Sequence, residues 1–161
     1  MPTGSRTGAT ASYLPGPVYC DASALVKLYV PEPESAAVNL ALGGRGDLLV
    51  SDLSVTEVAS SLARRRREGR LGREAAARAY AKLLEHVVSG IFQCVELSPD
   101  IHRKAERLLL VADAVSLRAA DALHLALAQV SDSNSMATYD HRLGQAARAA
   151  GLVVFPRESV S

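Results

Sequence analysis

Short apolar runs alternate with longer segments of helical periodicity along most of this chain. The apolar runs predict strands over residues 18–20, 47–50, 91–97, 136–138 and 152–155. Between these runs, apolar side chains recur at helical spacing over residues 22–30, 35–42, 55–67, 73–88, 99–112, 117–130 and 140–150. Strands that alternate with helices form parallel sheets covered on both faces. The pattern therefore predicts an α/β fold, a three-layer sandwich with a central parallel sheet of about five strands flanked by helices.

Proline, glycine and serine mark where several of these helices begin and end. Pro31 ends the first helix, and Gly43 follows the second, because proline cannot continue a helix and glycine tolerates the conformation that closes one. Pro99 opens the fifth helix. Ser54 is followed three residues later by Glu57, which is the spacing of a capping box. We therefore expect the third helix to begin after Ser54.

The chain divides into a short extension and one domain. Residues 1–17 are rich in Gly, Ser, Thr, Ala and Pro and lack apolar periodicity, so they predict a flexible N-terminal extension. Residues 18–161 are numerous and apolar enough for a single domain with its own core. The sequence has neither a run of about 20 apolar residues nor the order of a signal peptide. We expect a cytoplasmic protein with no membrane partner.

Charge and cysteine content narrow the classes of function. The net charge of +1 gives no overall basic field, so contact with nucleic acid would need a local patch. The densest basic segment is Arg64, Arg65, Arg66 and Arg67. It is foremost a solvated helix end, and contacts with an RNA backbone or an acidic partner are the other interpretations.

Known cofactor motifs are missing from the sequence. Cys20 and Cys94 lie in predicted strands among apolar residues, where free cysteine behaves as a small hydrophobe. The sequence contains neither a GxxxxGK[ST] phosphate loop nor the His and Cys spacing of a zinc site. With these sites excluded, carboxylates are the remaining candidates for functional groups.

Four acidic residues follow strands or begin helices: Asp21, Glu57, Asp121 and Asp140. The carboxyl ends of parallel strands meet at one edge of a sheet, which is where open α/β sheets bind ligands. The four carboxylates can therefore form one site. Asp21 and Asp140 are equally explained, one at a time, as helix N-caps, and Glu57 by its capping box.

Asp121 is the hardest of the four to explain structurally. It lies in the most apolar helix, where an ionised side chain is costly unless it is paired, capped or bound to metal. Arg118, one turn earlier, is a possible ion-pair partner. His124, one turn later, is interpreted as a packed or hydrogen-bonded core residue.

A cluster of these acids would need a cation, because like charges repel. Mg²⁺ or Mn²⁺ would relieve the repulsion, since hard ions prefer carboxylate and water oxygens. The hydroxyls of Ser23 and Thr138 could assist by orienting a carboxylate or a metal-bound water.

Four segments resemble the successive motifs of the PIN-domain ribonucleases, especially the toxin component of VapBC toxin–antitoxin pairs. The segments are DASALVKLYVPEPES, SVTEVASSLARR, LRAADALHLALA and TYDHRL, and the resemblance runs from residue 18 to about residue 155. It implies that the four acids are an acidic quartet that holds a divalent metal, with the two hydroxyls nearby. The N-terminal extension and His141 with Arg142 depart from the family pattern and could alter access to the site.

The resemblance implies a metal-dependent endoribonuclease that hydrolyses RNA phosphodiester bonds as the toxin of a type II toxin–antitoxin pair. Its partners would be an RNA substrate, a VapB-like antitoxin and a second copy of the chain. We assign Asp21 and Asp121 as metal anchors, while Glu57 and Asp140 complete the shell or orient the water. Two other functions stay open: a PIN-like module that binds RNA or protein without cleavage, and a housekeeping RNA-processing nuclease without an antitoxin.

Overall fold

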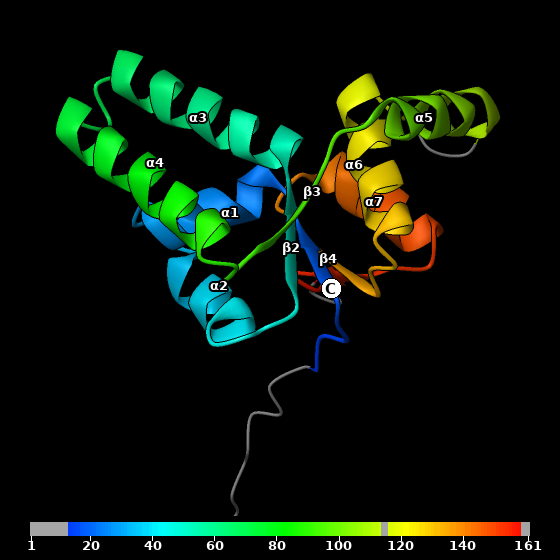
Figure 1. The fold of residues 1–161 in the computed structure, drawn as a ribbon, viewed down its shortest axis with the longest axis horizontal. Coiled ribbons are helices and arrows are strands. Elements are labelled where there is room, and N and C mark those ends of the chain that lie inside the picture. Colours follow the sequence, from blue (N-terminus) through cyan, green and yellow to red (C-terminus); the bar gives the residue numbers. More distant parts are fainter. Residues whose placement is uncertain (1–12, 114–115, 159–161) are drawn as a thin grey trace, which may run out of the picture.

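A computed structural model describes residues 13–113 and 116–158, which form a parallel sheet between two layers of helices. Figure 1 shows the sheet in the centre, with one group of helices on either side. The predicted three-layer α/β architecture is confirmed. None of the helices in the described ranges is long and apolar enough to cross a membrane.

The five strands of the described residues are short and lie in the order β3-β2-β1-β4-β5. All neighbouring pairs are parallel. Their bounds are β1 Val18–Cys20, β2 Leu48–Ser51, β3 Gln93–Val95, β4 Ser135–Ala137 and β5 Val153–Phe155. Each lies at or within about a residue or two of a predicted strand, apart from the longer run expected around β3.

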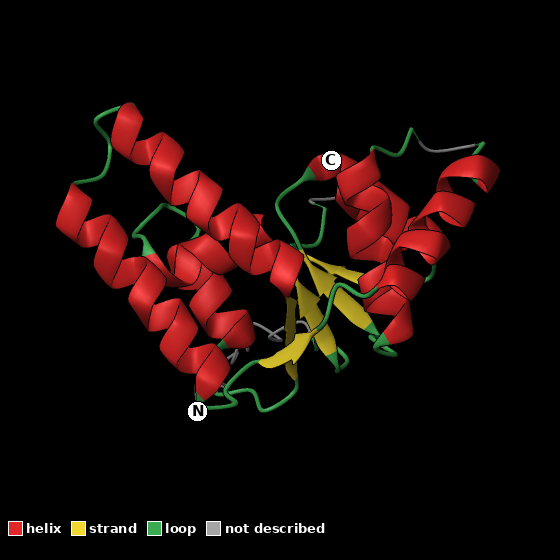
Figure 2. Ribbon diagram, turned by 45° about the horizontal axis from the view of Figure 1, so that its top comes forward, coloured by secondary structure: helices red, strands yellow, loops and turns green. Residues whose placement is uncertain are grey.

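Seven helices in the same ranges connect these strands. Four of them, α1 Ala22–Tyr29, α2 Ser35–Leu42, α3 Asp52–Arg67 and α4 Arg73–Val88, pack together on one side of the sheet. The other three, α5 Pro99–Val111, α6 Ala119–Val130 and α7 His141–Ala149, pack on the opposite side. Figure 2 shows the two helical layers in red and the sheet in yellow between them.

The strand order places a crevice between β1 and β4. From β1 the chain proceeds through α1 and α2 to β2 on one side, whereas from β4 it proceeds through α7 to β5 on the other. The direction of winding thus reverses between these two central strands. Ligands of open α/β sheets bind outside the carboxyl ends of the strands at such a reversal. The residues that directly follow β1 and β4 are therefore the first to inspect for a site.

Alternation along β1 distributes its side chains between two cores. Val18 and Cys20 pack with the layer of α1 to α4, whereas Tyr19 packs with the layer of α5 to α7. Successive side chains of a strand point to opposite faces, and all three here are fully buried. Tyr19 consequently lies beneath α6, which is decisive for the site described below.

Two local predictions were wrong. Helix α3 begins at Asp52, and its N-cap is Ser51, whose hydroxyl accepts a hydrogen bond from the Ser54 backbone N–H. The last residue of β2 therefore caps the helix directly, so Ser54 lies within the first turn and does not form a box with Glu57. Cys94 is exposed, because β3 is an edge strand of the sheet.

The predicted extension ends earlier than residue 17. Residues 1–12 lie outside the described residues, so that part stays a prediction. Leu14 is buried in the core, and the Pro17 carbonyl accepts hydrogen bonds from the backbone N–H groups of Asn134 and Ser135. Burial and backbone pairing thus join the segment from Leu14 onward to the domain.

Candidate active site at the carboxyl edge of the sheet

Asp21 directly follows β1 and caps helix α1. Its Oδ1 accepts hydrogen bonds from the Ala24 backbone N–H at 3.2 Å and from the Ser23 hydroxyl at 2.7 Å. Its Oδ2 accepts one from the Thr138 hydroxyl at 2.9 Å, across the crevice from β1 to β4. The residue is only 4% exposed. Asp21 is therefore both the predicted N-cap and a buried carboxylate at the crevice.

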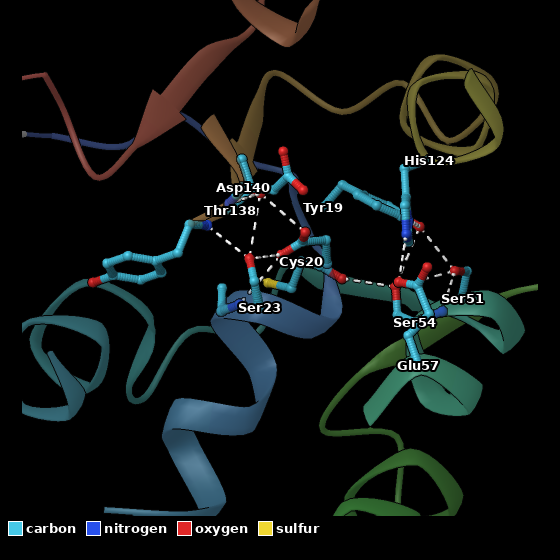
Figure 3. A network of polar contacts seen from close by, with 12 residues as sticks. Tyr19, Cys20, Ser23, Ser51, Ser54, Glu57, His124, Thr138 and Asp140 are labelled. Atoms are coloured by element: carbon cyan, nitrogen blue, oxygen red, sulfur yellow. Dashed lines mark hydrogen bonds and ion pairs between the residues drawn. The ribbon is translucent and has the colours of Figure 1, made fainter. Parts of the chain in front are cut away.

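Thr138 joins Asp21 to Asp140. Its Oγ1 also accepts a hydrogen bond from the Asp140 backbone N–H at 3.0 Å. The Asp140 side chain is exposed, and it caps α7 by accepting a hydrogen bond from the Leu143 N–H at 3.0 Å. Asp21, Ser23, Thr138 and Asp140 form one group, which we call the hydroxyl network (Figure 3).

The hydroxyl network supplies no cation to its buried carboxylate. Asp21 has no ion-pair partner within residues 13–113 and 116–158, and its hydrogen-bond donors there are neutral. Burial raises the pKa of the Asp21 carboxyl above its ordinary value, and it outweighs the charge of His124 and the three hydrogen bonds, which lower that pKa. An ionised Asp21 would therefore be stabilised by a bound cation.

Glu57 lies in the second turn of α3, where it meets a buried histidine. Its Oε2 lies 2.7 Å from Nε2 of His124 on α6, and its side chain is 34% exposed. An ionised carboxylate only accepts hydrogen bonds, so Nε2 carries the proton of this pair. The prediction that His124 is a hydrogen-bonded core residue is confirmed, since it is 3% exposed.

The other nitrogen of His124 faces Tyr19. Nδ1 lies 2.7 Å from the Tyr19 hydroxyl, which in turn contacts the hydroxyls of Ser51 at 2.8 Å and Ser54 at 3.3 Å. Burial raises the pKa of Tyr19, so this phenol keeps its proton. Tyr19, Ser51, Ser54, Glu57 and His124 form a second group, which we call the imidazole network.

The two networks lie on either side of the end of β1 (Figure 3). The Ser54 hydroxyl donates to the Cys20 carbonyl at 3.0 Å, so the imidazole network is anchored to the last residue of β1. Asp21, the next residue, belongs to the hydroxyl network. A single backbone segment thus positions both groups.

Asp121 lies at the start of α6 and is 6% exposed. Its Oδ2 accepts a hydrogen bond from the Arg118 backbone N–H at 3.0 Å. The ion pair suggested by the spacing is not formed, because within the described ranges the Arg118 guanidinium makes no ion pair with this carboxylate. Asp121 is consequently a second buried carboxylate without a cationic partner there.

The site is suited in its atom types to a hard divalent cation. Its carboxylate and hydroxyl oxygens are the ligands that Mg²⁺ and Mn²⁺ prefer. Across residues 13–113 and 116–158, however, no three His, Cys, Asp or Glu side chains are arranged closely enough to hold a metal ion. Hydrogen bonds join Asp21 to Asp140 and link Glu57 to the neighbouring network, while Asp121 belongs to neither. The four-carboxylate metal site stays a prediction.

The segment of four arginines forms the last turn of α3, away from the start of that helix. Arg65 is buried and ion-paired with Glu32, which also binds Lys27, so it is occupied within the fold. Arg64, Arg66 and Arg67 are exposed. The helix rises about 1.5 Å per residue, so these arginines lie about 20 Å along α3 from its start.

Sequence reasoning missed most of the imidazole network and a second basic region. Tyr19 reads as an ordinary strand residue, and its contact with His124 spans 105 positions. A groove of about 900 Å³ runs beside Asp140 and includes Arg118, Arg142 and Arg148. The available signal was that Arg118 and Arg142 closely flank two of the candidate acids in the sequence.

Comparisons with known proteins agree on one family. The model of the PIN domain family matches residues 18–149. Ribonuclease VapC46 of Mycobacterium tuberculosis is 35% identical over 142 residues, which are 85% of this chain and 95% of that protein.

Two solved structures share the fold. The crystal structure of Mycobacterium tuberculosis VapC20, a sarcin–ricin loop cleaving toxin, has a TM-score of 0.65 and 20% identity, and the match covers 84% of this chain and 96% of that one. The structure of PAE2754 from Pyrobaculum aerophilum has a TM-score of 0.62 and 25% identity, over 85% of this chain and 82% of the other.

Proposed function

This chain belongs to the PIN domain family, and on that premise we propose that it is a metal-dependent endoribonuclease acting as the toxin of a toxin–antitoxin pair. The supporting relative is a ribonuclease, and the match covers 95% of its length. A structural neighbour is a toxin that cleaves the sarcin–ricin loop. The observation that carries the proposal is the placement of buried Asp21 directly after β1 and of Asp140 shortly after β4, where Thr138 joins them at the reversal point of the sheet.

The residues of the site have distinct proposed roles. Asp21 and Asp121, both buried and without a cationic partner in the described ranges, would anchor Mg²⁺ or Mn²⁺. Asp140 and Glu57 would complete the shell or orient the attacking water. When bound, the metal supplies a more acidic water and neutralises charge on the phosphate oxygens.

The surrounding hydrogen bonds hold these carboxylates in place. Ser23 and Thr138 each donate to a different oxygen of Asp21, which fixes the plane of its carboxylate. His124 donates to Glu57 and so restrains a side chain that is otherwise partly exposed to solvent. Such supporting contacts orient metal ligands and typically affect metal affinity or activity by about 10- to 100-fold.

Metal-dependent cleavage is the first test. Purified protein is incubated with total bacterial RNA in Mg²⁺ or Mn²⁺, and new RNA ends are mapped by sequencing. We expect discrete cleavage sites that disappear in EDTA and return when the metal is restored. We also expect Asp121→Asn to lose at least about 100-fold in rate, because the substitution removes a charged metal anchor.

Two controls define what would refute this proposal. Arg66→Gln, on the exposed far end of α3, controls for the effect of a remote surface substitution and should cleave like the wild type, while Asp121→Asn purified in the same way reveals any contaminating nuclease. Cleavage that persists in EDTA, or in Asp121→Asn, contradicts the metal mechanism. Tight RNA binding with no cleavage under any metal identifies the chain as a binding module instead.

The partners are also proposed. The toxin role requires an antitoxin, and co-expression with the product of an adjacent small open reading frame should yield a stable complex that lacks ribonuclease activity. We further infer a homodimer, because Leu110 and Val111 of α5 and Val130 of α6 are large apolar side chains exposed on the layer of α5 to α7. Light scattering of the purified protein measures its mass directly.

Helix α1 also carries an apolar stripe, Leu25, Leu28 and Tyr29, which is not available for such an interface. Leu25 is fully buried, and Leu28 and Tyr29 pack against the same core cluster. That stripe belongs to the core of the layer formed by α1 to α4.

A further inference from the structure

A groove begins beside Asp140, between the first turns of two helices. It is lined on one side by Arg118, at the N-cap of α6, and on the other by His141 and Arg142 of α7. Helices α6 and α7 pack against each other in the same layer (Figure 1). The groove holds about 900 Å³ and contains none of the other three candidate acids. It therefore extends outward from the catalytic crevice on the Asp140 side.

The groove is lined by three arginines and two acidic residues, Asp140 and Glu158. Arg118 and Arg142 have no acidic partner within residues 13–113 and 116–158, although both line a surface groove. Arg148 is already used, since its guanidinium binds Glu158 at 2.8 Å and also contacts the Pro156 carbonyl. Two arginines therefore keep their donors available to a ligand.

The backbone reinforces this positive field. The first turns of α6 and α7 begin beside the groove, and the N-terminal end of a helix carries partial positive charge, which Asp140 offsets in part by binding the Leu143 N–H. Arg118 is also fixed to the site, because its own N–H donates to the Asp121 carboxylate at 3.0 Å. One arginine of the groove is thus tied to Asp121, a proposed metal anchor, and the groove borders Asp140, another of the candidate acids.

We propose that this groove binds the phosphate backbone of the RNA on one side of the cleaved bond, with Arg118 and Arg142 as its principal phosphate contacts. The inference rests on the proposed ribonuclease function and assigns the substrate-binding surface of that same site. Guanidinium groups bind phosphate oxygens through two parallel hydrogen bonds, which a groove flanked by two arginines can offer to successive phosphates. A ligand with regularly spaced anions is favoured over a single small anion.

The more conspicuous basic segment does not serve this purpose. Arg65 is committed to Glu32, and the remaining arginines of that segment lie at the opposite end of α3 from the crevice. The arginine segment has the higher charge density in the sequence, but only the groove lies beside a candidate acid, Asp140. This contrast provides a matched control for the experiment.

Direct RNA binding separates this proposal from catalysis. All proteins carry Asp21→Asn to prevent cleavage, and the affinity for a fluorescein-labelled 12-nucleotide single-stranded RNA is measured by anisotropy over a range of KCl concentrations. Arg118→Gln combined with Arg142→Gln should weaken binding by at least about 10-fold and reduce the salt slope by about 1.4, because two phosphate contacts are lost. Arg66→Gln combined with Arg67→Gln should change neither by more than about twofold.

Two results would overturn the assignment. An unchanged salt slope in the groove variant, with its thermal unfolding midpoint also unchanged, shows that the groove does not contact phosphates. Equally tight, arginine-dependent binding of a (Glu)12 peptide shows instead that the groove accepts an acidic protein segment. A failure of the ribonuclease proposal is distinguishable from a failure of this one. In the first case the wild type shows no metal-dependent cleavage, and the RNA affinity of the groove is still measured independently.

Discussion

The hydroxyl network and the imidazole network lie side by side, but their carboxylates differ in burial and in hydrogen-bond partners. In the hydroxyl network, Asp21 is 4% exposed and is bound by neutral donors only. In the imidazole network, the Glu57 side chain is 34% exposed and pairs with His124, a group that can itself become charged. Both are carboxylates at the same edge of the same sheet.

The difference indicates where a cation is required. An ionised carboxylate buried without a positive partner is costly, and a divalent ion removes that cost. Glu57 has both solvent and an imidazole, so it needs no ion in order to remain in place. The comparison thus assigns metal anchoring to Asp21 of the hydroxyl network and the positioning of a partly exposed carboxylate, Glu57, to the imidazole network.

Substituting Asp21 tests this assignment with the largest expected effect. Asp21→Asn keeps the shape and the acceptor for Ala24 but removes the charge, and we expect cleavage to fall by at least about 100-fold because a metal anchor is lost. In EDTA at neutral pH, the free energy of unfolding of the same variant should exceed that of the wild type by about 1 kcal/mol, since a buried charge is removed.

The pH dependence of that stability has a defined sign. Burial raises the folded pKa of Asp21 above its ordinary value of 3.8, so the folded chain holds this proton to higher pH than the unfolded chain. The wild type should therefore lose stability relative to Asp21→Asn as pH rises from about 3.8 through the folded pKa. Thermal unfolding from pH 3.5 to 8 in EDTA measures the gap, and Mg²⁺ should close it only in the wild type. A constant gap, or a greater stability of the wild type in EDTA, contradicts the account.

Substitutions of His124 test the other network and should have an intermediate effect. His124→Leu removes both hydrogen bonds, so cleavage should fall by about 10- to 100-fold as Glu57 loses its support. His124→Gln places an amide donor near the position of Nε2 and should restore most of the rate, while both variants lose stability because the Tyr19 hydroxyl loses a partner. Equal rates for the two variants would show that His124 serves packing alone.

The Thr138 hydroxyl joins the Asp21 carboxylate to the Asp140 backbone N–H, and its removal should give the smallest effect. Thr138→Val keeps the shape but removes the bond to Asp21 and the acceptor for the Asp140 N–H. We expect the Mn²⁺ affinity, measured by calorimetry, to fall by about 10-fold. Thr138→Ser retains the hydroxyl and is the matched control. A loss of affinity in Thr138→Ser equal to that in Thr138→Val would show that the hydroxyl alone does not determine the affinity.

Local patterns predicted much of the fold and part of the site. Apolar runs and helical spacing indicated each strand and helix to within a few residues, because burial requires a period of two or 3.6. Asp21 and Asp140 were recognisable as caps, since an N-cap depends on neighbours only three residues away. The start of α3 was missed because Ser51 and Ser54 are both acceptable caps, and only the end of β2 selects Ser51.

The sequence by itself determined the α/β class, the positions of Asp21, Asp121 and Asp140 at strand ends or helix starts, and the resemblance that the family match confirms. Only the tertiary structure decided which of these acids share hydrogen bonds and which arginines border them. Tyr19 meets His124 across 105 positions, and Glu32 occupies Arg65 across 33. Contacts of that range follow from strand order and helix packing, which no local pattern specifies.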